Sequence, residues 1–404
     1  MLPAGAVAGW VSHPLESAAF PRRTPDSDIG RRERRTGRTC QQGHLDSERF
    51  RSVHRTRPAL CGSLTVRRTL RRESTVFGMK RREFITLLGG SAAWPLAAYA
   101  QQPTMPVVGF LGSRSLADSA NLVAAFRAGL GESGFIDDRN VTIEFRWAEG
   151  HYDRLAGLAA DLVSRQVAVL AAPGGIAAGL AAKATTTRIP IIFLTGADPV
   201  QFGLVTSLNR PGGNVTGVAI LTNTLAPKQL ELLHEVVPTA KLVAFLVNPK
   251  NPIAETDTRD LHSAASTTRQ QILVVKASDE SEIENAFAAM VQERAGALLV
   301  QSDPFFNSRP PQIVALAAHH AIPAIYQWRD FPVAGGLMSY GTVLADAYRQ
   351  VGIYTGKILQ GTKPGDLPVQ QSVKVQLIIN LKTAKAFGLT FPLALLGRAD
   401  EVIE

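Results

Sequence analysis

Short apolar runs alternate with amphipathic stretches along this chain from residue 106 onward. The apolar runs are predicted strands, and the stretches between them, where apolar positions recur at helical spacing, are predicted helices. The first strands are expected at 106–112, 141–147, 167–173 and 190–196, and the helices between them at 120–134, 152–166 and 176–187. Continuous apolar strands separated by helices are typical of parallel sheets covered on both faces. The pattern therefore predicts a doubly wound α/β unit.

This pattern stops at 208–218, where Pro211, Gly212 and Gly213 follow one another, and then starts again. Further strands are expected at 215–221, 241–249, 271–277, 296–304 and 322–328, with helices near 227–236, 255–269, 281–294 and 310–320. A second glycine-rich break at 331–341 precedes a helix at 345–361 and a polar–apolar alternation at 373–389.

We therefore predict an α/β protein with two doubly wound, Rossmann-like lobes joined by a hinge that the chain crosses more than once. Lobe 1 is expected at 101–212 and lobe 2 at 213–335. Residues 336–404 are expected to cross the hinge and return to pack on lobe 1. A clamshell of this kind closes around a small molecule held between its lobes.

The first 78 residues differ in composition from the rest of the chain. They contain 15 Arg and no Lys, carry a net charge of +8, and include both cysteines, Cys40 and Cys61. One interpretation is a basic arm that binds nucleic acid. The other is GC-rich DNA translated from upstream of the true start, and we expect this one, with Met79 as the native start. If residues 1–78 are translated, we expect them to be disordered.

Residues 79–100 have the three parts of an export signal. Lys80, Arg81 and Arg82 form a basic head, a modestly apolar run follows, and Ala98-Tyr99-Ala100 predicts cleavage before Gln101. The apolar run is shorter than the ~20 residues that span a membrane. The paired arginines favour a twin-arginine signal, and an ordinary secretory signal is the alternative. Either route predicts a periplasmic protein, and a signal that acts at the N-terminus argues against a nucleic-acid-binding arm before it.

The net positive charge of the chain comes from its first 100 residues. Residues 1–78 carry +8 and residues 79–100 carry +2 of the total net charge of +9, so residues 101–404 carry −1. This part gives no electrostatic reason to expect binding to nucleic acid or to an anionic membrane. It also has no cysteine, which excludes disulfides, thiolate metal sites and a cysteine nucleophile there.

Candidate binding residues follow the predicted strands, because ligands of open parallel α/β sheets bind beyond the carboxyl ends of the strands. They are Ser113, Ser115, Gly174, Gly175, Thr195, Asp198, Thr222, Asn223, Asn248, Asp303, Tyr326, Ser339 and Tyr340. Hydroxyls, small residues and free amides at helix starts suit a carboxylate. For any one of these residues taken alone, an ordinary helix cap or turn residue is the favoured interpretation. The case for a site rests on the convergence of these loops at one edge.

Asp198 and Asp303 share one context, since each follows an apolar strand and precedes proline. We interpret them first as turn formers, second as partners for a ligand's ammonium group, and last as an acid–base pair. Aromatic residues near the same edge would either wall a ligand ring or pack in the core. These are Phe305, Phe306, Tyr326, Trp328 and Tyr340.

Catalytic and cofactor motifs are absent from the sequence. It has no G-x-S-x-G elbow, no P-loop and no H-E-x-x-H. The glycines of GGIAAG at 174–179 do not have dinucleotide-binding spacing. We therefore expect no enzymatic activity, no cofactor and no metal site.

Several segments resemble one protein family. They are MKRREFITLLGG at 79–90, VGFLG at 108–112, GLVTSLNRPGGNVTGV at 203–218 and YRQVGIYTGKILQGTKPGDLPVQ at 348–370. The chain from about Met79 to its C-terminus resembles the ABC transporter substrate-binding proteins of the tryptophan/tyrosine type. The resemblance implies a type I periplasmic binding fold and delivery of a ligand to a membrane permease. For an amino-acid ligand, Ser113, Thr195 and Ser339 would serve the carboxylate, Asp303 or Asp198 the ammonium, and Tyr326 or Tyr340 the ring.

The expected function is the periplasmic solute-binding component of an ABC importer, a monomer whose partners are a small amino-acid-like or aromatic solute and an inner-membrane permease. The first alternative is a sensor component that presents its ligand to a membrane receptor. A periplasmic enzyme is a more distant one. A sugar-responsive gene regulator is disfavoured, because no helix-turn-helix segment precedes the first lobe.

Overall fold

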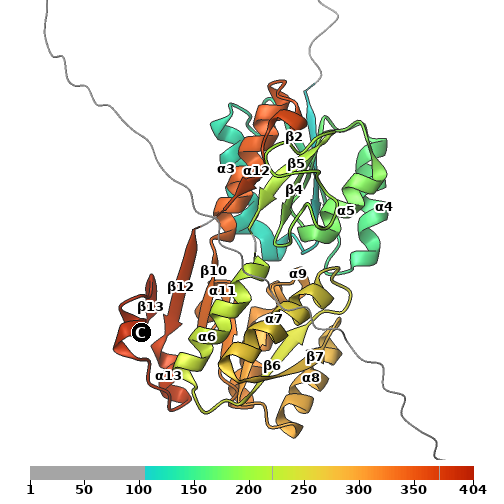
Figure 1. Cartoon of the computed structure of the whole chain (residues 1–404). Coiled ribbons are helices and arrows are strands. Elements are labelled where there is room, and N and C mark those ends of the chain that lie inside the picture. The colour runs from blue at the N-terminus through green and yellow to red at the C-terminus, as the bar shows by residue number, and fades with distance from the viewer. Residues whose placement is uncertain (1–104, 221, 373) are drawn as a thin grey trace, which may run out of the picture. The chain divides into compact units, whose positions relative to one another are not determined.

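The computed structural model describes residues 105–404, apart from 221 and 373 and the side chains of 223 and 268. The predicted export signal and the segment before it lie outside the described residues. The described part contains two sheets, each with helices on both faces (Figure 1). No helix in residues 105–404 combines the length and the apolar character that crossing a membrane requires.

The first sheet, which defines lobe 1, has the strand order β11-β5-β4-β3-β1-β2 and parallel pairing throughout. Its strands are β1 (Val107–Gly112), β2 (Thr142–Trp147), β3 (Val169–Ala172), β4 (Ile191–Thr195), β5 (Val215–Ala219) and β11 (Gln370–Gln371). One face is covered by α3 (Ala120–Glu132) and α12 (Leu344–Leu359), the other by α4 (Leu155–Ser164) and α5 (Gly175–Thr185). Burial on both faces explains why these strands read as continuous apolar runs.

The second sheet, which defines lobe 2, has the order β13-β12-β10-β9-β8-β6-β7. Its strands are β6 (Leu242–Val247), β7 (Gln271–Lys276), β8 (Ala297–Val300), β9 (Ala324–Tyr326), β10 (Met338–Thr342), β12 (Val375–Asn380) and β13 (Glu401–Ile403). One face packs against α8 (Glu280–Gln292) and α10 (Pro310–His319), the other against α6 (Ala226–Val236) and α7 (Ala254–Thr268). The β10–β12 pair is antiparallel, in contrast to the parallel pairs around it.

Short elements complete the connections. The short helices are α9 (Pro304–Asn307), α11 (Asp330–Val333), α13 (Leu381–Ala386) and α14 (Leu393–Leu396). Turns of 3₁₀ helix are η1 (Ala117–Ser119), η2 (Tyr152–Arg154), η3 (Thr222–Leu225) and η4 (Pro364–Asp366).

Between residues 105 and 404 the chain passes from one sheet to the other three times. It leaves lobe 1 after β5, returns to it between β10 and α12, and leaves it again between β11 and β12. Two α/β lobes with several crossings form the clamshell that the sequence predicted, in the type I arrangement that the family resemblance implies. The fold class expected from the hydrophobic pattern is therefore confirmed.

The structure corrects the predicted lobe boundaries. The segment 215–221 was expected to open lobe 2, but β5 pairs with β4 over its whole length and belongs to lobe 1. The glycine-rich segment 331–341 was expected to be a break, yet it contains most of β10, which pairs on both sides. Beyond residue 336, α12 and β11 do join lobe 1, whereas β12 and β13 join lobe 2. Strand pairing across the sequence, and not local composition, sets these boundaries.

Helix α12 is fixed to α3 at very short range, although the two are more than 200 residues apart in sequence. A Cβ added at Gly129 would overlap the carbonyl of Arg349, and one added at Gly352 would overlap the carbonyl of Phe126. An ion pair of 2.7 Å between Arg349 and Glu132 joins the same two helices. This packing makes the late helix α12 part of lobe 1, beside the cavity described next.

Candidate ligand-binding site

A cavity lies among the loops that follow the strands of both lobes. Its empty volume is about 650 Å³, part of it open to solvent, and small-molecule sites usually measure roughly 300–1,000 Å³. Lobe 1 contributes the loops after β1, β2, β3 and β4, and lobe 2 those after β6, β8 and β9. The first turn of α12 and the start of η3 complete the wall. The cavity therefore lies at the carboxyl ends of the strands, where ligands of parallel sheets bind.

The N-terminus of α5 forms one side of this cavity. Gly174, Gly175, Ile176 and Ala177 line it, and no side chain caps the helix. Gly175 has a φ of +84°, which glycine adopts readily and other residues rarely do. Behind this turn, the Ser113 hydroxyl donates a 2.5 Å hydrogen bond to the Gly174 carbonyl. The uncapped first turn presents backbone N–H groups and the positive end of the helix dipole, an arrangement that favours an anion.

Arg114 supplies a charge in the same wall. It is 9% exposed, and its Nη2 donates a 2.8 Å hydrogen bond to the carbonyl of Asn307 in lobe 2. Its Nε is buried and has no hydrogen-bond partner among the described residues. It makes no ion pair with a carboxylate in residues 105–404 as described. A buried guanidinium without a counter-ion is energetically unfavourable unless a ligand supplies one.

Asp303 is fully buried behind the cavity wall. Its Oδ1 accepts hydrogen bonds from Asn248 Nδ2 (3.1 Å) and the Phe305 backbone N–H (2.9 Å). Its Oδ2 accepts from the Tyr152 hydroxyl (2.6 Å), which comes from lobe 1, and from Asn251 Nδ2 (2.8 Å). A carboxylate has about four lone-pair sites, and all of them are used here. Asp303 therefore holds Tyr152 and Asn251 in the cavity wall and does not face the cavity itself.

Burial is the main cause of the pKa shifts of Asp303 and Tyr152. Burial raises the pKa of Asp303, against the four hydrogen bonds that lower it. Burial, together with the neighbouring Asp303 carboxylate, raises the pKa of the Tyr152 phenol well above its ordinary value. Tyr152 therefore stays protonated at neutral pH and donates to Asp303 across the two lobes.

Aromatic and aliphatic side chains form the rest of the wall. Trp328 and Tyr348 line the cavity together with Tyr152. The Tyr348 hydroxyl donates to the Pro173 carbonyl at 3.2 Å, and burial raises the pKa of this phenol to about 12. The aliphatic part consists of Ile176, Leu194, Ile220, Ile253, Pro304 and Leu344. A mostly apolar pocket with a few polar groups is typical of small-molecule sites.

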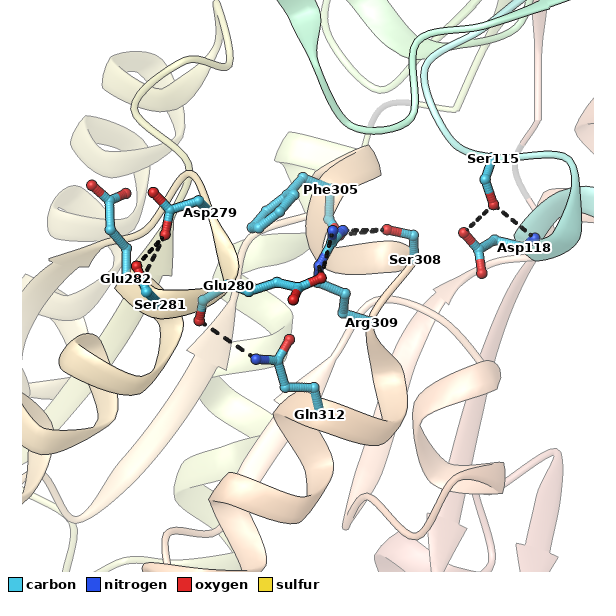
Figure 2. Close-up of polar contacts among 10 residues, drawn as sticks. All are labelled: Ser115, Asp118, Asp279, Glu280, Ser281, Glu282, Phe305, Ser308, Arg309 and Gln312. Carbon is cyan, nitrogen blue, oxygen red and sulfur yellow. Dashed lines mark hydrogen bonds and ion pairs between the residues drawn. The ribbon is translucent and has the colours of Figure 1, made fainter.

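Arg309 holds α9, the short helix that supplies Pro304 and Asn307 to the cavity wall. Figure 2 shows its guanidinium between Glu280, Phe305 and Ser308. It donates to the Phe305 carbonyl at 3.1 Å and to the Ser308 hydroxyl at 2.8 Å, and it pairs with Glu280 at 3.1 Å. It also lies 4.1 Å from the centre of the Phe305 ring. These contacts place the Asn307 carbonyl where Arg114 can reach it.

Four of the candidate residues from the sequence line the cavity. They are Gly174, Gly175, Thr195 and Thr222. The hydroxyl of Thr195 accepts from the Ala197 backbone N–H at 3.0 Å, and that of Thr222 donates to the Gly196 carbonyl at 3.4 Å.

Other candidates lie behind the wall or away from it. Ser113 is hydrogen-bonded to the lining residue Gly174, and Asp303 to the lining residues Tyr152 and Asn251. Asn248 donates to Asp303. The Ser115 hydroxyl donates to the Asp118 carboxylate at 2.5 Å on the surface (Figure 2). Asp198 accepts from the Val200 backbone N–H at 2.8 Å, as in the turn that was its first interpretation.

Three of the remaining candidates belong to lobe 2, and the side chain of the fourth is not among the described residues. Tyr326 is 1% exposed and stacks on Phe331 in the core, with ring centres 4.4 Å apart. Ser339 lines a second cavity beside β10, and Tyr340 packs against the core of lobe 2. Tyr326 lies on β9, and Ser339 and Tyr340 lie on β10. The side chain of Asn223 is outside the described residues.

Sequence reasoning did not single out Arg114, Tyr152, Asn251 and Tyr348, which line the cavity. Arg114 stood within a predicted strand-end loop, and a single arginine between two serines was the available signal. Tyr348 comes from a helix far along the chain, so no local pattern could place it. Among the described residues, no group of three or more His, Cys, Asp or Glu side chains could hold a metal ion.

A family model described as ABC transporter substrate binding protein matches residues 115–403. This chain belongs to that family. Members of this family are the binding component of a transporter and catalyse no reaction. They bind a small-molecule solute. A tyrosine-binding protein from Clostridioides difficile is 28% identical over 65% of this chain and 75% of its own length.

Solved structures show the same fold. The ABC domain in complex with L-Trp from Streptococcus pneumoniae has a TM-score of 0.67 and 26% identity, over 74% of this chain and 100% of its own. A conserved domain protein from Vibrio cholerae has a TM-score of 0.69 and 24% identity over the same shares. A ligand-free, open substrate-binding protein with adhesive properties from Clostridium difficile has a TM-score of 0.53 and 24% identity, over 74% of this chain and 99% of its own.

Proposed function

We propose that this substrate-binding protein is the periplasmic component of an ABC importer and binds a small amino-acid-like or aromatic solute between its two lobes. The observation that carries the proposal is the cavity itself. It combines a buried Arg114, which has no ion-pair partner among the described residues, and the uncapped N-terminus of α5 with the rings of Tyr152, Trp328 and Tyr348. Relatives named for tyrosine and L-Trp support an aromatic solute.

The partners and location follow from the same proposal. The bound solute is delivered to a permease in the inner membrane. Residues 79–100 direct export, by the twin-arginine or the general secretory route, with cleavage near Ala100. The binding protein acts as a monomer and contacts no nucleic acid.

A thermal-shift screen of the full-length protein against amino acids, aromatic acids and sugars tests the proposed solute class. A ligand that binds the folded state, at about 100-fold excess over its dissociation constant, adds roughly 2.7 kcal/mol to the free energy of unfolding. We expect a saturable rise in melting temperature with aromatic compounds that carry a carboxylate. A folded protein that responds only to sugars, or to neither amino acids nor aromatic compounds, would overturn the proposal.

A further inference from the structure

We propose that the cavity recognises the carboxylate of an aromatic acid and offers no charged partner to an α-ammonium group. Its preferred substrates are then aromatic monocarboxylates without an amino group, rather than zwitterionic amino acids. This inference rests on the proposed function, because it specifies which solute the same cavity takes.

Arg114 is the first basis of the inference. Among the described residues that line the cavity it is the one that carries a formal charge, and it is nine-tenths buried. One of its nitrogens is occupied by the Asn307 carbonyl, while the buried Nε lacks a partner. A ligand carboxylate beside the guanidinium would supply the missing counter-ion.

The first turn of α5 is the second basis, because it adds donors of the same kind in the same cavity. The helix has eleven residues and no capping side chain, and its Gly174–Ala177 turn lines the cavity. Arg114 and this turn both favour negative charge, so their effects add on one anionic group of the ligand.

No acidic side chain among the described residues lines this cavity, and the carboxylate of Asp257 belongs to a smaller adjoining pocket that shares Thr222 and Ser302 with it. Asp303, the nearest candidate in the sequence, lies behind the wall with each oxygen accepting two hydrogen bonds. It has no lone-pair site left for an ammonium group.

Charge balance then separates the two ligand classes. A monocarboxylate neutralises Arg114 and leaves no net charge in the cavity. A zwitterion brings the same carboxylate together with an ammonium group, which would lose its water without gaining an anionic partner. The rings of Tyr152, Trp328 and Tyr348 provide the apolar surface for the aromatic part in both cases.

Isothermal titration calorimetry of the full-length protein with three matched probes tests the inference. The probes are L-tryptophan, indole-3-propionate, which lacks the amino group, and tryptamine, which lacks the carboxylate. We expect indole-3-propionate to bind at least about tenfold more tightly than L-tryptophan, and tryptamine not to bind. L-Tryptophan binding more tightly than indole-3-propionate would overturn the inference and leave the proposed function intact. Binding of none of the three, with the same result for the matched phenyl and phenol series, would count against the proposed function itself.

Two variants identify the groups responsible. Arg114→Gln should raise the dissociation constant of indole-3-propionate by about 10- to 100-fold, whereas Arg188→Gln removes an exposed arginine of lobe 1 and should leave it unchanged. Asp303→Asn should weaken both indole acids by the same factor, because Asp303 acts through Tyr152 and Asn251. A selective loss of L-tryptophan affinity in Asp303→Asn would assign it to the ammonium group and overturn the inference. If Asp303→Asn does not fold, the ratio of the dissociation constants of L-tryptophan and indole-3-propionate in the unmodified protein still tests the inference.

Discussion

At the scale of single residues, the two deeply buried aspartates of lobe 2 have unequal surroundings. Asp303 receives four hydrogen bonds. Asp257, in the first turn of α7, accepts one from Gln301 at 2.7 Å, and its Oδ1 is buried without a partner among the described residues. Burial raises the pKa of Asp257 to about 7, and the charges of Asp260 and Asp303 contribute to the increase. Asp257 is therefore a poorly stabilised carboxylate at neutral pH.

This imbalance predicts a pH dependence of stability. The pKa of Asp257 is about 7 in the folded state and about 3.9 in the unfolded chain, so the folded state binds the proton more tightly. The contribution of this group is present below about pH 4 and is lost as the pH rises to about 7. We expect Asp257→Asn to raise the free energy of unfolding by about 1–3 kcal/mol at pH 8, after allowing for the buried amide.

Urea unfolding of the two proteins at pH 4, 5.5, 7 and 8 provides the measurement. The difference in the free energy of unfolding between Asp257→Asn and the unmodified protein should be close to zero at pH 4. At that pH Asp257 is protonated in the folded state and resembles Asn. A difference that is constant over the whole range would show that Asp257 has an unshifted pKa.

At the scale of elements, lobe 1 depends on the α3–α12 contact, where two glycines allow the helix backbones to touch. We expect Gly352→Ala to lower the free energy of unfolding by about 3 kcal/mol or more, because the new methyl group would overlap the Phe126 carbonyl. Thermal and urea unfolding measure the loss.

Gly131→Ala is the matched control on α3. A Cβ at Gly131 would meet nothing within 4 Å. Alanine there should raise stability by about 0.5–1 kcal/mol through its better helix propensity. If both alanine variants had the same effect, close packing between α3 and α12 would not be what the two glycines provide.

At the scale of the whole molecule, the two lobes are joined across the cavity by the bonds from Tyr152 to Asp303 and from Arg114 to Asn307. We expect Tyr152→Phe to raise the dissociation constant for indole-3-propionate about tenfold, because the closed form loses a hydrogen bond to a buried carboxylate. Calorimetric titration measures this change.

Tyr348→Phe is the control for this change. It removes a hydroxyl from the same cavity, but that hydroxyl bonds to Pro173 within lobe 1. We expect the dissociation constant to change by about twofold or less, since lobe closure does not need this bond. Equal losses in the two variants would mean that Tyr152 acts as part of the cavity lining and not as a bond between lobes.

The sequence by itself determined the architecture of this protein. A buried parallel strand must be apolar on both faces, and a helix that covers the sheet must be apolar on one. Local pattern was therefore enough to recognise the strands β1–β4 and β6–β9 and the helices between them. Because ligands of such sheets bind at the strand ends, the position of the candidate cavity followed as well, with Gly174, Gly175, Thr195 and Thr222 in its wall.

Only the tertiary structure decided which lobe each segment joins and which side chains face the cavity. The pairing of β5 with β4 and the docking of α12 on α3 are long-range contacts that leave no local signal. The direction of a side chain depends on its neighbours in space. Asp303 and Tyr326 both belong to segments predicted as strands. In the structure Asp303 accepts four hydrogen bonds, one of them from Tyr152, and Tyr326 stacks on Phe331. Arg114 and Tyr348 meet at the cavity because folding brings together segments more than 200 residues apart.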